Sequence, residues 1–131
     1  MQVSPYLNFP GNCKEAFEFY AKVLGAKIET MQTHADSPMK DERADWGDKI
    51  LHVTMKVDDT TLSGSDAPPE YYHKPEGFYV TLGIEKPPDA DRIYNALKDG
   101  GSVQMPIQET FWAKRFAMLT DRYGIPWMIN C

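Results

Sequence analysis

Glu109 is the residue of this chain whose neighbours best suit acid–base chemistry. It follows Gln108 and precedes the run Thr110-Phe111-Trp112. Aromatic side chains can exclude water from a carboxylate and raise its pKa, as a general base requires. The alternative, which we favour, is a carboxylate at a strand end that accepts hydrogen bonds from backbone groups or from Arg115.

A second group of residues has the character of a ligand pocket, which combines aromatic surface with a few polar anchors. The aromatic candidates are Tyr6, Tyr79, Trp112 and Trp127, and the polar candidates are Asn8, Ser63, Ser65, Gln108 and Asn130. A core or a dimer interface would equally explain the aromatic residues, and hydrogen bonding at strand edges would explain the polar ones. These residue types are consistent with a site for a small apolar or aromatic molecule.

The three histidines, His34, His52 and His73, have no i, i+2 or i, i+4 spacing that would suggest a metal pair. For each of them an ordinary surface or hydrogen-bonded histidine is the better interpretation. His52 is kept as a candidate ligand-binding residue because it lies early in a predicted strand.

Several kinds of chemistry find no motif in the sequence. There is no Ser-His-Asp or Cys-His arrangement, no phosphate-binding glycine loop and no C-x-x-C pair. Gly100-Gly101 follows a predicted helix and is interpreted as its C-cap, since a phosphate loop would precede the helix. Cys13 and Cys131 are expected to be free thiols in a reducing compartment.

Length and composition predict one globular domain. The 131 residues are 42% hydrophobic and 25% charged, and no apolar run approaches the length of a membrane span. The net charge of −5 comes from mixed charges without a basic stripe, so nucleic acid is not an expected partner. Residues 1–5 lack a basic and apolar leader, so we expect a cytoplasmic protein.

The order of the predicted elements repeats once along the chain. A helix is expected after Asn12, an N-cap for which Glu15 would complete a capping box, and it ends at Gly25. A second helix opens at Pro87-Pro88 and closes at Gly100-Gly101. Strands are predicted over 3–9, 26–34, 50–57, 60–65, 78–84, 103–107, 109–113, 115–120 and 125–130. Residues 35–48 are predicted to form a long mobile loop.

The two halves therefore form one β-α-β-β-β unit written twice. Tyr6, Phe9, Tyr20 and Leu24 match Tyr79, Leu82, Ile93 and Leu97 with a constant offset of 73 positions. We predict one domain, 1–131, made of modules 1–66 and 77–131 that are joined by the proline-rich linker 67–76. Chance similarity between strand-helix segments is the competing explanation.

Two segments resemble a known family. SPYLNFPGNCKEAFEFY near the start and QETFWAKRFAMLTDRYGIPWMIN at the end are similar to the PhnB-like branch of the vicinal oxygen chelate superfamily, which includes glyoxalase I, bleomycin-resistance proteins and extradiol dioxygenases. The resemblance implies an α+β fold in which two βαβββ modules form a curved mixed sheet with the helices outside. It also implies a homodimer with a cleft on the concave side of each sheet.

Metal enzymes of this superfamily take His, Gln or Glu ligands from the first and last strands of each module. The corresponding windows, residues 4–8, 60–65, 77–81 and 125–130, contain no His and no carboxylate. Asn8 and Asn130 are neutral amides, too weak alone to hold a transition metal. We therefore expect no metal site and no cofactor.

The combined expectation is a metal-independent protein that binds a small apolar or aromatic molecule, as the bleomycin-resistance branch does. The alternative is a metal-independent isomerase or lyase that uses Glu109 as its general base, with Asn8 or Ser63 orienting the substrate.

Overall fold

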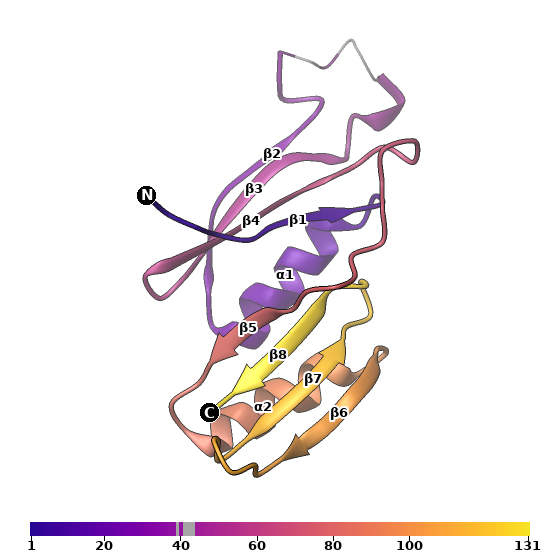
Figure 1. Ribbon diagram of the computed structural model, residues 1–131. Helices are drawn as coiled ribbons and strands as arrows, with labels where there is room; N and C mark the ends of the chain where they lie inside the picture. Colours follow the sequence, from indigo (N-terminus) through magenta and orange to yellow (C-terminus); the bar gives the residue numbers. More distant parts are fainter. Residues whose placement is uncertain (39, 41–43) are drawn as a thin grey trace. The chain divides into compact units, whose positions relative to one another are not determined.

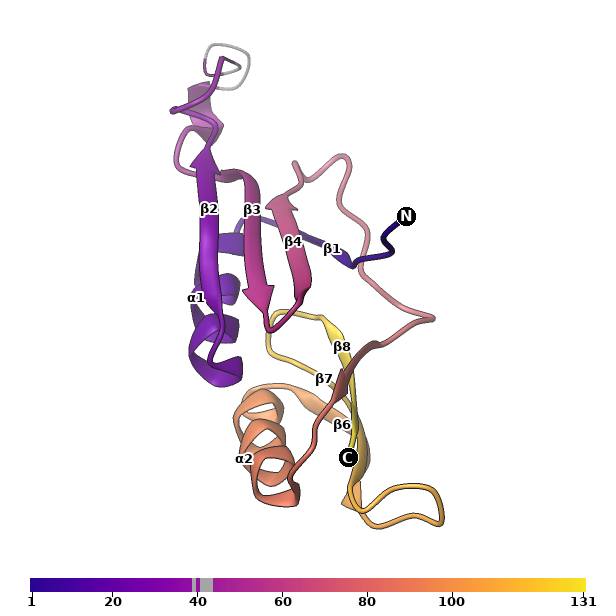
Figure 2. The same cartoon turned by 90° about the vertical axis from the view of Figure 1, so that its left-hand side faces the viewer.

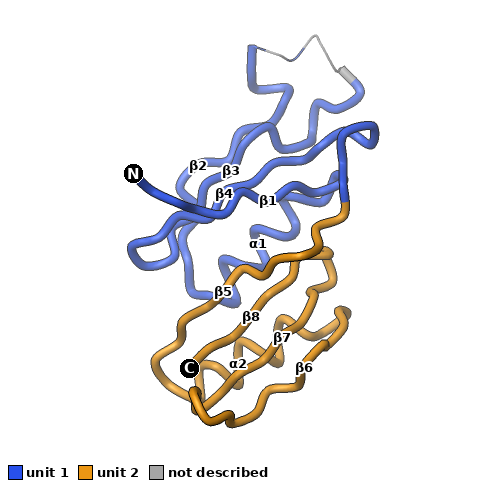
Figure 3. Tube along the Cα trace, in the orientation of Figure 1, with its two compact units in different colours: residues 1–73 blue, residues 74–131 orange. Residues whose placement is uncertain are grey.

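The chain divides into two compact units, Met1–His73 and Lys74–Cys131, each of which is described by itself (Figure 3). This computed structural model describes residues 1–38, 40 and 44–131 (Figure 1). The boundary between the units falls inside the predicted linker, residues 67–76. None of the helices in the described ranges has the length and hydropathy needed to cross a membrane.

Unit 1 is a four-stranded mixed sheet, here called sheet 1, with one long helix. Its strand order is β1-β4-β3-β2; β1 runs parallel to β4, whereas the other neighbours are antiparallel. The elements are β1 Tyr6–Phe9, α1 Cys13–Leu24, β2 Lys27–Thr33, the short 3-10 helix η1 Ala44–Trp46, β3 Ile50–Val57 and β4 Thr60–Asp66.

Unit 2 repeats this topology in sheet 2, whose strand order is β5-β8-β7-β6 with β5 parallel to β8. The elements are β5 Val80–Gly83, α2 Pro87–Lys98, β6 Ser102–Gln108, β7 Phe116–Thr120 and β8 Pro126–Asn130. The predicted α+β fold of two βαβββ modules is therefore confirmed, with the strands divided between two four-stranded sheets.

Each helix packs on one face of its own sheet (Figure 2). Alternate strand residues such as Val53 and Met55, and Leu119 in unit 2, are fully or almost fully buried, because successive side chains point to opposite faces. α1 buries Phe17 and Tyr20, which lie three residues apart on the apolar face of the helix. On the other face of each sheet, none of the described residues of the same unit forms a long helix that packs there, and this face is called the open face below.

The two units fill the space between helix and sheet in opposite ways. In unit 1 the helix supplies the large side chain, since Phe17 lies against Gly64, where an added Cβ would come within 2.7 Å of the Phe17 ring. In unit 2 the strand supplies it. Trp127 occupies the register position equivalent to Gly64, and Ala90, 73 positions after Phe17, is fully buried. The paired sizes follow from the need for close packing.

Asp66 closes the N-terminus of α1, a role that the sequence assigned to Asn12. The Asp66 Oδ1 accepts a hydrogen bond from the Cys13 backbone N–H at 2.9 Å, and Oδ2 accepts one from the Ile50 N–H at 2.8 Å. The predicted capping box is wrong: Asn12 makes no side-chain cap hydrogen bond. Its ψ of 27° departs from the extended conformation that directs an N-cap side chain towards the second and third helical N–H groups.

Several predictions of local structure differ from the structure. The predicted strand 109–113 is wrong, because Thr110 and Ala113 close a local turn through Thr110 N–H to the Ala113 carbonyl and Ala113 N–H to the Thr110 hydroxyl. The first strand begins at Tyr6, after Pro5, which has no N–H to donate. Within the predicted 35–48 loop, residues 44–46 form η1, and residues 39 and 41–43 lie outside the described residues.

Replacement of Asp66 by alanine should lower the free energy of unfolding by about 2–4 kcal/mol. Asp66 is only 6% exposed, and without its carboxylate the backbone N–H groups of Cys13 and Ile50 would lose their acceptor. Urea unfolding followed by circular dichroism measures the change. The matched control is Asp59→Ala in the exposed β3–β4 turn, which should stay within about 0.5 kcal/mol of the parent. Equal stabilities for the two variants would contradict the role of Asp66.

Candidate functional site

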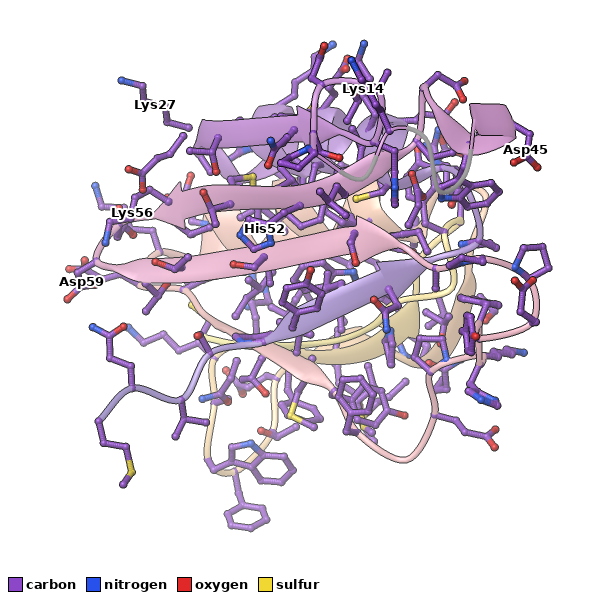
Figure 4. The ribbon with its side chains drawn as sticks, turned by 90° about the horizontal axis from the view of Figure 1, so that it is seen from above. Lys14, Lys27, Asp45, His52, Lys56 and Asp59 are labelled. Atoms are coloured by element: carbon purple, nitrogen blue, oxygen red, sulfur yellow. The ribbon has the colours of Figure 1, made fainter. Side chains whose placement is uncertain are left out.

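The open face of sheet 1 gathers five of the residues that the sequence singled out. The parallel register places Tyr6 opposite Ser63 and Asn8 opposite Ser65. His52 lies on the same face, because its neighbour Val53 points towards α1. Figure 4 shows His52 among the strands of this sheet. Residues that are distant in the sequence therefore form one polar surface.

Contacts between these side chains order part of that surface. The Tyr6 hydroxyl lies 3.3 Å from the His52 Nδ1, and the two rings are stacked with centroids 5.8 Å apart and planes inclined by 26°. The Ser65 hydroxyl donates to the Asn8 Oδ1 at 3.3 Å. Tyr6 is 52% exposed. The Tyr6 and His52 rings thus offer a flat aromatic surface beside hydroxyl and amide groups.

Further polar residues of sheet 1 belong to the same face, although the sequence analysis did not select them. Thr54 pairs with both Ser63 and Thr30, and the two threonine hydroxyls lie 2.6 Å apart. Lys56 follows Thr54 at the next position on this face. A strict two-residue step from His52 would have identified both residues, because alternate residues of a strand share a face.

In unit 2, three candidates surround Phe116 on the open face of sheet 2. Phe116 pairs with Gln108 on one side and with Asn130 on the other. The Trp112 ring meets the Phe116 ring edge-on at a centroid distance of 5.2 Å, and Trp112 is 53% exposed. This cluster combines an aromatic surface with two amides.

Tyr79 lies apart from the Phe116 cluster, in a hollow of about 320 Å³ at another part of the open face. The hollow is lined by residues 74–77 and by Phe78, Tyr79, Ser102, Gln104, Thr120 and Pro126. Its volume is at the lower end of the range for small-molecule pockets. No sequence motif marks it, since its lining comes from four separate segments.

Trp127 lies in the core of unit 2, which is one of the two alternatives left open by the sequence. Its side chain is fully buried, and its indole N–H donates to the Asp121 Oδ2 at 2.8 Å. The other Asp121 oxygen accepts hydrogen bonds from the Tyr123 and Ile125 N–H groups. In this structure Trp127 presents no surface to a ligand.

Glu109 lies in the loop between β6 and β7 and is exposed. The aromatic neighbours that could have desolvated it point elsewhere: Phe111 is 98% exposed and Trp112 contacts Phe116. A carboxylate in contact with water lacks the water-excluded surroundings that an efficient general base needs. The surroundings of Glu109 therefore do not favour the isomerase or lyase alternative.

In the described part of the chain, no group of three or more His, Cys, Asp or Glu side chains lies close enough together to hold a metal ion. The parallel strand pairs that supply metal ligands in the superfamily carry Tyr6, Asn8, Ser63 and Ser65 in sheet 1. They carry Thr81, Met128 and Asn130 in sheet 2. Hydroxyl, thioether and amide groups are poor ligands for a divalent transition metal.

Solved structures of other proteins share the fold of this chain. Protein PA1353 from Pseudomonas aeruginosa matches with 47% identity and a TM-score of 0.92, covering 100% of this chain and 97% of that one. The fosfomycin resistance protein FosX from Listeria monocytogenes shares the fold at 8% identity, with a TM-score of 0.68 over 99% of this chain and 91% of its own.

The family follows from the sequence match. Residues 1–130 match the family model described as 3-demethylubiquinone-9 3-methyltransferase, and the chain belongs to this PhnB-like family. Protein YjdN of Escherichia coli K12 is 32% identical over 139 residues, which cover 99% of this chain and 95% of that protein. The resemblance inferred from the two terminal segments is confirmed.

The two cysteines should differ in reactivity. Both are free, Cys13 being fully buried and Cys131 half-buried. Burial, together with the negative charge of Asp66, raises the pKa of the Cys13 thiol far above its ordinary value. At pH 8 the Cys13 thiolate is therefore absent, and only Cys131 should react with a thiol reagent.

Titration with a chromogenic disulfide reagent tests this difference. We expect one reactive thiol per folded chain, two after unfolding in guanidinium, and none in the folded Cys131→Ser variant. Rapid modification of Cys13 in that folded variant would show that its thiol is accessible and ionised.

Proposed function

We propose that this protein binds a small apolar or aromatic molecule on the open faces of its sheets without the help of a metal. The observation that carries the proposal is the convergence of Tyr6, Asn8, His52, Ser63 and Ser65 on one face of sheet 1. A stacked ring pair with nearby hydroxyl and amide groups suits a flat ligand that carries a few polar atoms.

Sheet 2 supports the same proposal through different residues. Trp112 and Phe116 provide aromatic surface next to Gln108 and Asn130, and the hollow at Tyr79 adds a concave surface. Family membership supplies no substrate. We do not propose the methyltransferase activity that the family description names, because the sequence contains no methyl-donor loop.

The remaining parts of the proposal concern assembly and location. We propose a homodimer, which the superfamily resemblance implies, and a cytoplasmic protein with two reduced thiols. The two free cysteines support the second part, because reduced thiols are typical of cytoplasmic proteins.

Filling the open face of sheet 1 should abolish binding while the fold is kept. Ser63→Trp places an indole among Tyr6, Asn8 and Thr54 and should weaken binding of the neutral aromatic probe 1-naphthol at least tenfold. The control Lys22→Trp adds the same ring to an exposed position of α1 and should leave the affinity within twofold. Fluorescence titration measures both affinities, and thermal unfolding confirms that both variants fold.

An equal affinity in the two tryptophan variants would place the binding site away from the open face of sheet 1. Native mass spectrometry of the purified protein provides an independent check, because any molecule that co-purifies should be displaced by 1-naphthol in the parent and should be absent from the Ser63→Trp variant.

Elemental analysis tests metal independence. Protein purified without added cation should contain far less than one equivalent of any transition metal, since the first and last strands of each module offer only weak donors. Added zinc should leave the affinity for 1-naphthol unchanged. About one equivalent of zinc, nickel, manganese or iron per chain would contradict the proposal.

A further inference from the structure

Lys27 and Lys56 form a pair of like charges on the open face of sheet 1. β2 and β3 place them directly opposite each other, next to the pair formed by Ile28 and Met55. Met55 is fully buried against the helix side, so the two lysines point to the opposite face, the one that carries His52 and Thr54. Figure 4 shows Lys27 and Lys56 at the same end of the strands.

Among the described residues, no salt bridge offsets the repulsion between the two lysines. Neither lysine takes part in a salt bridge, whereas Lys49, Arg92, Arg115 and Arg122 each have a carboxylate partner. Directly opposed like charges destabilise a sheet. A lysine on an edge strand can serve to prevent aggregation, which accounts for Lys27 in β2. It does not account for Lys56, because β3 lies between β2 and β4.

Hydroxyl groups surround this pair of positive charges. Lys56 is paired on its other side with Thr61, and Thr54 with Ser63 follows in the next row of the same face. The register positions of this face hold no carboxylate. The nearest acidic residues by sequence are Glu29, which lies at the irregularity in β2, and Asp58 and Asp59, which form the β3–β4 turn.

We propose that this end of the open face binds an oxyanion group, a carboxylate or a phosphate, carried by the aromatic ligand. This inference rests on the proposed function. Lys27 and Lys56 supply the positive charge, the Thr54, Thr61 and Ser63 hydroxyls donate hydrogen bonds to the anionic oxygens, and the ring of the ligand lies towards Tyr6 and His52. Two ammonium groups held on one face attract an anion in a chain whose net charge is negative.

Three related probes separate charge recognition from ring recognition: phenyl phosphate, benzoate and the uncharged phenol. Nuclear magnetic resonance titration of backbone amides measures each affinity and locates the site. In the parent protein, phenyl phosphate and benzoate should shift the amides of Thr54, Lys56, Thr61 and Ser63, and both should bind at least tenfold more tightly than phenol. Their affinity should fall as salt is raised, because salt screens exposed charges.

Two double variants are compared: K27Q/K56Q tests the lysine pair, and K14Q/K22Q is its control. Each double variant removes two positive charges, and the control positions lie on exposed parts of α1. K27Q/K56Q should lose at least tenfold in affinity for the anionic probes and keep its affinity for phenol. Its thermal stability should be unchanged or higher, because the opposed charges are gone. K14Q/K22Q should bind all three probes as the parent does.

The outcomes distinguish the two levels of the proposal. If phenol shifts the open-face amides as strongly as the anionic probes do, or if both double variants bind those probes equally, the oxyanion site is wrong and small-molecule binding on this face stands. If no probe shifts an open-face amide and 1-naphthol does not bind, the proposed function is wrong as well.

Discussion

The carboxylate of Asp66 determines how unit 1 is assembled. It is the last residue of β4 and pairs with Phe9 at the end of β1, while its two oxygens bind the first N–H of α1 and the N–H of Ile50 at the start of β3. One buried residue therefore joins the helix to three strands. A negative group at this position also suits the partial positive charge of a helix N-terminus. Because the parallel β1–β4 register ends at Asp66, the same residue aligns Tyr6 with Ser63 and Asn8 with Ser65.

Unit 2 achieves the same topology with a different buried carboxylate. Asp121 binds two N–H groups within its own turn and the indole N–H of Trp127, so it connects β7 and β8. In unit 1 Phe17 lies against Gly64, whereas in unit 2 the equivalent positions hold the buried Ala90 and Trp127. The two copies of the fold thus use different core residues and different buried carboxylates. Both satisfy the same requirements, because buried polar groups are paired and the core volume is filled.

The two open faces differ in chemistry, although the topology that creates them is the same. Sheet 1 presents lysine, threonine, serine, asparagine and a tyrosine–histidine pair. Sheet 2 presents Met118 and Met128 side by side, next to Phe116 and Trp112. Polar groups suit directional recognition, whereas thioether and aromatic groups adapt to apolar shapes.

The repeated βαβββ order, the position of both helices and most of the candidate residues could be predicted from the amino-acid sequence. Local signals carry this information: apolar residues at helical spacing, Gly25 at a helix end with φ of 63°, and two-residue alternation in strands. The alternation also explains why Tyr6, Asn8, Ser63 and Ser65 could be selected together. The family followed from two segments at the ends of the chain.

Which of these residues come into contact and which are buried depends on contacts between distant parts of the fold. Asp66 replaced Asn12 as the helix cap, Trp127 entered the core, and Thr110 with Ala113 formed a turn where a strand was predicted. Each outcome depends on a partner that is distant in sequence or on a competing local hydrogen bond, which propensity does not specify. The opposition of Lys27 and Lys56 is of the same kind, because a strand register arises only when two segments pair.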